Sequence, residues 1–115
     1  MKGVLVDPYL ETIKNVEVED WRDIQKHLQC SIFGSGGYDE GGDAIYVNDE
    51  GLFEEDAFWY CPDVYPYPYA GRVLFLGINP ANGESQDAWL DDVDVRDMDY
   101  KFMTREEVSV MGDLG

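Results

Sequence analysis

The residues best suited to nucleophilic catalysis are His27, the only histidine, and Cys30, three positions further on. An imidazole can take the proton of a thiol when a third group orients the ring. The spacing of these two residues permits such a pair but supplies no third group. We therefore interpret His27 as a surface side chain and Cys30 as a thiol facing the core, and we predict that the chain is not an enzyme.

A dense run of carboxylates near the C-terminus could bind a divalent cation: Asp91, Asp92, Asp94, Asp97 and Asp99. The helix–loop–helix calcium site needs acids at alternate positions, then a glycine at the sixth and a glutamate at the twelfth. Counted from Asp92, the fifth position is Arg96 and no glycine stands at the sixth. One histidine and two cysteines are too few for a structural zinc site without carboxylates. We predict no metal site and no cofactor, although weak association of Mg²⁺ or Ca²⁺ with this run stays open.

Glycine is concentrated between Gly34 and Gly42, and this density predicts a loop. Successive backbone N–H groups from Gly34 to Gly37 could cradle a phosphate. The segment lacks the Lys-Ser/Thr ending of a phosphate-binding loop, and no cation lies near it in the sequence. We therefore expect a flexible hairpin loop.

Aromatic residues and prolines crowd a later segment, in which four rings are candidate binding residues: Trp59, Tyr65, Tyr67 and Tyr69. If buried, these rings would wall the core; if exposed, they would form a rigid surface for a protein or a small ligand. Single-stranded nucleic acid would need interleaved cations, which are missing. We expect the rings to be mostly core, with some tyrosine hydroxyls reaching solvent.

Charge is the strongest signal in the composition, because 25 Asp and Glu residues against eight Lys and Arg give a formal net charge of −17. No Lys or Arg lies between His27 and Gly71. This field disfavours direct binding to DNA, RNA or an anionic membrane and favours a partner protein with a basic surface. The candidate acidic surface comprises Asp39, Glu40, Asp43, Asp49, Glu50, Glu54, Glu55, Asp56, Asp91, Asp92 and Asp94. On one face of the fold, these carboxylates would make a continuous negative ridge.

Hydrophobic patterning predicts strands at 3–6, 12–18, 30–33, 44–47 and 72–78. The last of these is apolar enough on both sides to be central in a sheet. The first two are expected to form a hairpin. The predicted core consists of Val4, Val6, Val16, Trp21, Ile24, Leu28, Ile45, Val47, Val73, Phe75 and Leu76.

Helix signals are fewer. Asp20 predicts the N-cap of a helix about three turns long that carries Trp21, Ile24 and Leu28 on one stripe. A short helix is expected at 54–60. The spacing of Thr104 and Glu107 predicts a capping box at the start of a short C-terminal helix.

These elements predict an α+β fold, a small mixed or antiparallel sheet with one main helix packed on it and a short C-terminal helix. The length suits a single acidic domain, 1–115, in which residues 100–115 are a candidate peripheral tail. No apolar run is long enough to span a bilayer, and the N-terminus lacks the pattern of a signal peptide. We therefore expect a cytoplasmic protein with Cys30 and Cys61 as free thiols.

Three stretches of strands and turns resemble a known family: Met1–Tyr9, Asp43–Leu52 and Pro68–Gly77. They are similar to domain of unknown function 3846, a group of small proteins encoded mainly by tailed phages and prophages. The resemblance extends over most of the chain, from Met1 to Asp99. It implies a phage origin and expression inside an infected bacterium, and it brings no catalytic or ligand residues. Small accessory phage proteins often act on host machinery.

Two functions from different classes follow. The first is an accessory protein that binds a basic host protein, with carboxylates that mimic phosphates and so block a host DNA- or RNA-binding protein. A compact chain of this length spans roughly 34 Å, over which duplex DNA carries about 20 phosphates. The alternative is a small-ligand protein that sequesters a nucleotide signal between the Gly34–Gly42 loop and the aromatic–proline segment, with Arg72 as the best cation. Plain solubility is a third explanation of the charge.

Overall fold

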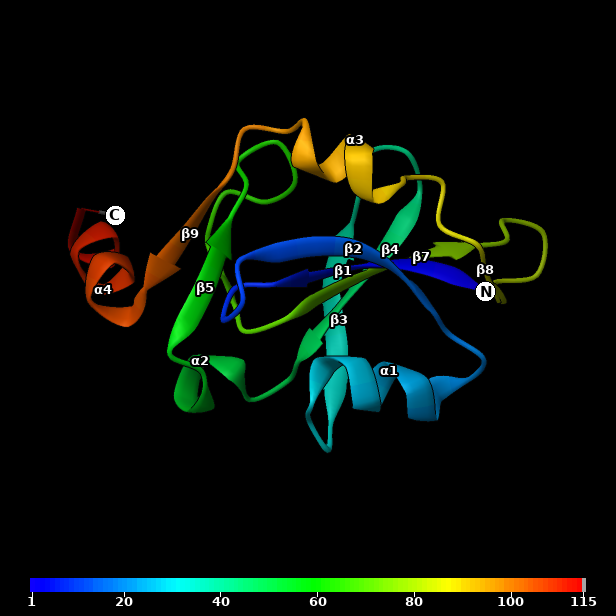
Figure 1. Cartoon of the computed structure of the whole chain (residues 1–115), viewed down its shortest axis with the longest axis horizontal. Coiled ribbons are helices and arrows are strands. Elements are labelled where there is room, and N and C mark those ends of the chain that lie inside the picture. The colour runs from blue at the N-terminus through cyan, green and yellow to red at the C-terminus, as the bar shows by residue number, and fades with distance from the viewer. Residues whose placement is uncertain (115) are drawn as a thin grey trace.

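The fold is α+β, as predicted, and consists of two antiparallel sheets and four helices (Figure 1). The computed structural model describes residues 1–114. The larger sheet contains β1 (Lys2–Asp7), β2 (Thr12–Glu17), β3 (Phe33–Tyr38), β4 (Asp43–Asn48), β7 (Val73–Ile78) and β8 (Ser85–Gln86). The smaller sheet contains β5 (Ala57–Tyr60), β6 (Tyr69–Ala70) and β9 (Lys101–Thr104). The helices are α1 (Trp21–Leu28), α2 (Gly51–Glu54), α3 (Asp92–Arg96) and α4 (Arg105–Leu114).

The larger sheet has the strand order β2-β1-β7-β4-β3, with the short β8 paired to β7. The predicted hairpin of the first two strands is confirmed, and β7 is central as expected. Strand β7 is apolar at every position because both of its faces are covered. Val73 and Phe75 pack in the cluster that contains Trp59, whereas Leu74 and Leu76 pack with α1.

Helix α1 begins after Asp20, whose side chain accepts a hydrogen bond from the backbone N–H of Arg22. Ile24 and Leu28 are buried against the larger sheet, in agreement with the prediction. The expectation that Trp21 belongs to the core is wrong, because its side chain is 56% exposed. Helix α1 has only eight residues and contacts the sheet through Ile24 and Leu28. Trp21 is its first residue, and the centre of the Trp21 ring lies 5.2 Å from the Arg22 guanidinium carbon.

The predicted Gly34–Gly42 loop is wrong over its first half, because β3 continues to Tyr38 and only Asp39–Gly42 forms the turn into β4. Glycine is unfavourable in an isolated strand, but here an aromatic ring occupies the space that a side chain would need. A Cβ atom at Gly36 would lie 2.9 Å from the ring of Tyr69. Tertiary packing has overridden the local signal.

The short helix expected at 54–60 is also wrong. The helix there, α2, ends at Glu54, and Ala57–Tyr60 forms β5 in the middle of the smaller sheet. Phe58 and Trp59 are both buried but belong to different clusters. Successive side chains on opposite faces are what a strand produces and a helix does not.

The C-terminal helix is confirmed together with its capping box, since Thr104 and Glu107 each donate a backbone N–H to the other's side chain. This helix, α4, has ten residues and packs on the smaller sheet, whereas α1, with eight residues, packs on the larger one. The candidate tail 100–115 needs correction as well, because Lys101–Thr104 forms β9 and pairs with β5. Within residues 1–114, no helix combines the length and the apolar character that crossing a bilayer requires.

Candidate functional site

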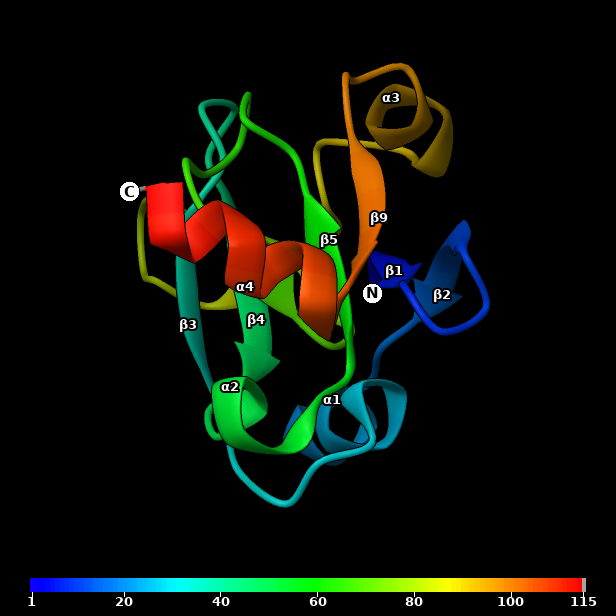
Figure 2. The ribbon, with the colours of Figure 1, turned by 90° about the vertical axis from the view of Figure 1, so that its left-hand side faces the viewer.

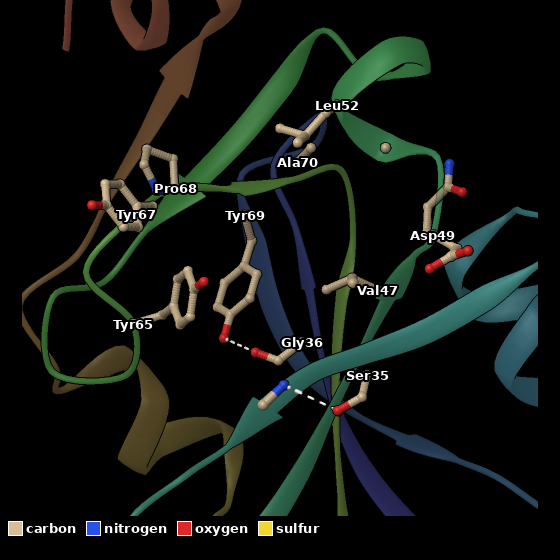
Figure 3. Close-up of a pocket in the computed structure, with 13 residues that line it drawn as sticks. Ser35, Gly36, Val47, Asp49, Leu52, Tyr65, Tyr67, Pro68, Tyr69 and Ala70 are labelled. Atoms are coloured by element: carbon tan, nitrogen blue, oxygen red, sulfur yellow. Dashed lines mark hydrogen bonds between the residues drawn. The ribbon is translucent and has the colours of Figure 1, made fainter. Parts of the chain in front are cut away.

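The candidate binding site is a cleft between β3 and the segment that leads into β6 (Figure 3). Its volume is about 660 Å³. One wall is the backbone of Ser35, Gly36 and Gly37, and the other is built from tyrosines and Pro68. The two segments that the sequence analysis proposed as pocket walls therefore do lie side by side. We call this hollow the tyrosine cleft.

A ladder of aromatic rings runs from the core into the tyrosine cleft. Trp59 stacks on Tyr69 with ring centroids 6.3 Å apart, and Tyr69 stacks on Tyr65 at 5.2 Å. Tyr67 follows at 6.0 Å from Tyr65. The candidate aromatic residues thus divide into two groups. Trp59 and Tyr69 are buried and form core, whereas Tyr65 and Tyr67 are 41% and 64% exposed and can contact a ligand.

Tyr69 fixes the ladder to β3. Its hydroxyl donates a hydrogen bond of 2.6 Å to the backbone carbonyl of Gly36, and Figure 3 shows this bond crossing the floor of the cleft. Burial raises the pKa of Tyr69, and the neighbouring Tyr65 and Cys61 raise it further. The phenol is therefore a stable hydrogen-bond donor and no proton-transfer group near neutral pH.

The opposite end of the tyrosine cleft carries a carboxylate. Asp49 follows β4, and its side chain lies over Gly34, where a Cβ atom would be 2.6 Å from the Asp49 Oδ1 atom. Leu52 of α2 completes this end. No Lys, Arg or His is among the described residues that line the cleft, so its only formal charge is negative.

Two members of the predicted acidic surface are not on the surface. Asp43 is fully buried, and its carboxylate accepts the backbone N–H groups of Trp89 at 2.8 Å and Leu90 at 3.0 Å. Glu55 is buried too, and it accepts hydrogen bonds from the Tyr9 hydroxyl and from the Asn48 amide. Both buried carboxylates hold structural hydrogen bonds, so their assignment to the acidic surface is wrong.

Five members of that set that are not buried lie at opposite ends of β4. The half-buried Asp39 and the exposed Glu40 lie in the turn before the strand, whereas the exposed Asp49, Glu50 and Glu54 lie after it. A six-residue strand is about 17 Å long from end to end. In Figures 1 and 2, α3 lies toward the top of the view and α2 toward the bottom, on opposite sides of the molecule.

The carboxylates of α3 are engaged locally. Asp91 pairs with Lys2, and Asp92 pairs with Arg96 at 3.2 Å. Asp94 accepts the backbone N–H of Asp91 in a capping box. Asp56, near the other end, pairs with Arg105 at 3.2 Å. Because Asp43 and Glu55 are buried, the condition for one continuous ridge of all eleven carboxylates is not met.

The candidate catalytic pair is not assembled. The Nε2 atom of His27 lies 2.7 Å from the backbone carbonyl of Glu17, so the imidazole is engaged there. Cys30 is half-buried, and burial together with Glu55 and Glu54 raises the pKa of its thiol. A raised pKa keeps the sulfur protonated and unreactive. Over the described part of the chain, no group of three or more His, Cys, Asp or Glu side chains is arranged to hold a metal ion.

Arg72, the best cation for an anionic ligand by sequence, is already engaged. Its Nε atom lies 3.2 Å from the Asp7 carboxylate, and its guanidinium lies 4.8 Å from the centre of the Tyr9 ring. Val47 and Leu52 also line the tyrosine cleft, and neither was predicted from the sequence. The alternation of β4 could have identified Val47, but nothing local to Leu52 points to its place at the cleft.

No family model, curated protein or solved structure matches the chain. The resemblance to domain of unknown function 3846 therefore stays a prediction, as does the phage origin that it implies.

Proposed function

We propose that the chain is a binding protein without catalytic activity, and that the tyrosine cleft takes a positively charged segment of a partner protein. One observation carries the proposal: the cleft presents exposed tyrosine rings and the Asp49 carboxylate, and no cation is among its described lining residues. Aromatic faces and a carboxylate are the groups that recognise a lysine or arginine side chain.

The charge of the whole chain acts in the same direction. A net charge of −17 attracts a basic partner from a distance and speeds its encounter, while the cleft selects what stays bound. The exposed carboxylates at both ends of β4 contribute to this field but are too far apart to form one contact patch. Steering by such charges is screened by salt.

The resemblance to a phage family supports a site of action inside an infected bacterium, with a host protein as the partner. A host protein with a basic groove for DNA or RNA would meet these requirements, and an occupied groove would no longer bind its nucleic acid. In this proposal the mimicry of nucleic acid comes from overall charge rather than from a ridge with phosphate spacing.

A small ligand is the second candidate, because about 660 Å³ lies within the usual range for small-molecule sites. A nucleotide, however, brings phosphates that need cations or several donors. The described lining residues offer no cation, and Arg72 is held by Asp7. A basic peptide therefore fits the cleft better than an anionic nucleotide.

A labelled peptide of alternating lysine and threonine tests the proposal by fluorescence anisotropy. We expect the wild-type protein to bind it, with weaker binding at higher salt. Tyr67→Ala should weaken binding by roughly twofold to thirtyfold, the range of one cation–π contact. Asp49→Asn should weaken it as well, whereas Glu40→Gln, an equal loss of charge in the turn at the other end of β4, should change the affinity less.

Two results would contradict the proposal. One is the absence of binding to any basic peptide at low salt. The other is tight binding of a nucleotide that Tyr67→Ala abolishes, which would assign the cleft to the small-ligand function.

A further inference from the structure

We infer that the partner segment binds as an added β-strand along the free edge of β3, with alternate side chains entering the tyrosine cleft. This inference rests on the proposed function and specifies how the ligand is held. Strand β3 is the last strand of the larger sheet, and within residues 1–114 its only strand partner is β4. An edge strand presents unpaired backbone groups to which an extended peptide can pair.

The hydrogen-bond pattern identifies which groups of β3 point outward. Asp49 donates its backbone N–H to Ile32 at 3.1 Å, and Asp39 donates its own to Asp43 at 2.8 Å. Hydrogen-bonded and non-bonded pairs alternate along an antiparallel ladder. Counted from either end along β4, Tyr46 belongs to a non-bonded pair with β3, and its partner is Ser35. The N–H and C=O of Ser35 therefore point away from β4, toward the open edge.

The other edge of the sheet is protected, and this contrast supports the assignment. Strand β2 is covered by α3, from which Arg96 donates to the Ile13 carbonyl at 2.6 Å. The backbone N–H of Asp92 also bonds to the Asn15 side chain at 2.9 Å. Among the described residues, the bond that the backbone of β3 receives from an element other than β4 is that of the Tyr69 hydroxyl at Gly36. Strand β3 also carries neither a lysine nor a proline, which commonly protect edge strands.

An added strand would lie about 4.8 Å from β3, the usual spacing in a sheet. The face of β3 that meets Tyr69, Ile45 and Val47 at Gly36 is the face that forms the floor of the tyrosine cleft. Every second side chain of the added strand would project from that face, toward Tyr65 and Tyr67. Main-chain pairing would supply affinity, and the cleft would select for basic side chains.

Charge argues against a second copy of this chain as the occupant. Each copy carries −17, so two copies joined edge to edge would bring like charges together. A basic segment has the opposite sign and also complements Asp49 at the end of the cleft.

Backbone methylation of the ligand tests this mode with the wild-type protein. One form of the alternating lysine–threonine peptide is N-methylated at its lysines only, and a second form at its threonines only. Successive amides of a strand point to opposite edges, so only one form loses the amides that pair with β3. We expect that form to bind about tenfold more weakly or worse and the other form to keep most of its affinity. Equal effects of the two forms would overturn the strand model.

Substitution of Ser35 provides a second test. Proline is tolerated on an edge strand where the N–H faces away from the sheet, so Ser35→Pro should leave the fold intact, as checked by far-ultraviolet circular dichroism. It removes one outward donor and obstructs an added strand. Ser35→Ala is the matched control, because it also loses the bond from the Gly37 N–H to the Ser35 hydroxyl but keeps the outward donor. We expect Ser35→Pro to weaken peptide binding at least about tenfold more than Ser35→Ala does.

The outcomes separate this inference from the proposed function. If the peptide binds, depends on Tyr67 and ignores both Ser35→Pro and the methylation pattern, the cleft takes a basic segment without strand addition. If the peptide does not bind at all, both proposals fail. A dimer in sedimentation experiments that Ser35→Pro dissociates would make a second copy the occupant and overturn the inference.

Discussion

The Tyr69 hydroxyl and the Gly36 carbonyl, 2.6 Å apart, join two segments that are 33 positions apart in the chain. The bond holds an aromatic ladder against a strand that has no side chain at this point. The cleft exists because β3 is bare there, so that the tyrosine ring rests on backbone while its neighbours Tyr65 and Tyr67 remain exposed.

Gly36→Ala should destabilise the protein. Its Cβ would lie 2.9 Å from the Tyr69 ring and 3.2 Å from both Ile45 and Val47, and these side chains are held by the core. We expect the free energy of unfolding to fall by about 1–3 kcal/mol, the usual range for overpacking, as measured by urea denaturation. Gly34→Ala is the control, since its clash is with the mobile carboxylate of Asp49. Equal effects at the two positions would show that Tyr69 can move aside.

Asp43→Ala should also be costly, because it leaves the N–H groups of Trp89 and Leu90 without an acceptor. Because the lost acceptor is a charged carboxylate, we expect the free energy of unfolding to fall by about 2–3 kcal/mol. Glu40→Ala removes an exposed carboxylate nearby in the chain and should stay within roughly 0.5 kcal/mol of wild type. A neutral effect of Asp43→Ala would show that the two N–H groups find another acceptor and that the structural role given to Asp43 is wrong.

Sequence predicted those parts of the fold in which local pattern and tertiary environment agree. Strand β7 is apolar throughout and is central, and Thr104 with Glu107 is both a sequence motif and a formed capping box. The pattern misleads where long-range packing decides. The glycines of β3 signal a loop until the Tyr69 ring is placed over Gly36.

The candidate site was predictable to a similar degree. The two segments that form the walls of the tyrosine cleft were predicted from the sequence, because local composition shows both the many glycines of one and the many aromatic residues of the other. Which carboxylates are buried was not predictable from the sequence. Asp43 and Glu55 differ from exposed acids only because hydrogen-bond donors distant in the chain contact them. Chemical type is readable from sequence, whereas burial depends on which elements become neighbours.

Arg72→Ala should lower the free energy of unfolding more than the loss of an exposed ion pair does. Asp7 is buried and also accepts the backbone N–H of Tyr9, so removal of Arg72 leaves a buried charge poorly compensated. We expect a loss of about 3 kcal/mol in the free energy of unfolding. Arg22→Ala, which breaks an exposed pair with Asp20, should cost less than about 1 kcal/mol. Equal, small effects in thermal and urea denaturation would show that Asp7 does not depend on Arg72.

Tyr69 should make stability depend on pH in the alkaline range. Burial raises its pKa in the folded protein, whereas in the unfolded chain it ionises near its ordinary value of about 10. Above that pH the folded state retains a proton that the unfolded state has lost, so the free energy of unfolding must fall as pH rises. Below that pH the stabilisation from the protonated Tyr69 hydroxyl is fully present.

Urea denaturation between pH 8 and 11 should show this fall in the free energy of unfolding in the wild type and a shallower one in Tyr69→Phe. The variant should also lose about 1 kcal/mol at neutral pH, because the bond to Gly36 is gone. Tyr38→Phe, which removes the hydroxyl of an exposed ring at the end of β3, should retain the wild-type slope. A wild-type slope in Tyr69→Phe would mean that the hydroxyl is not held in a buried hydrogen bond to β3.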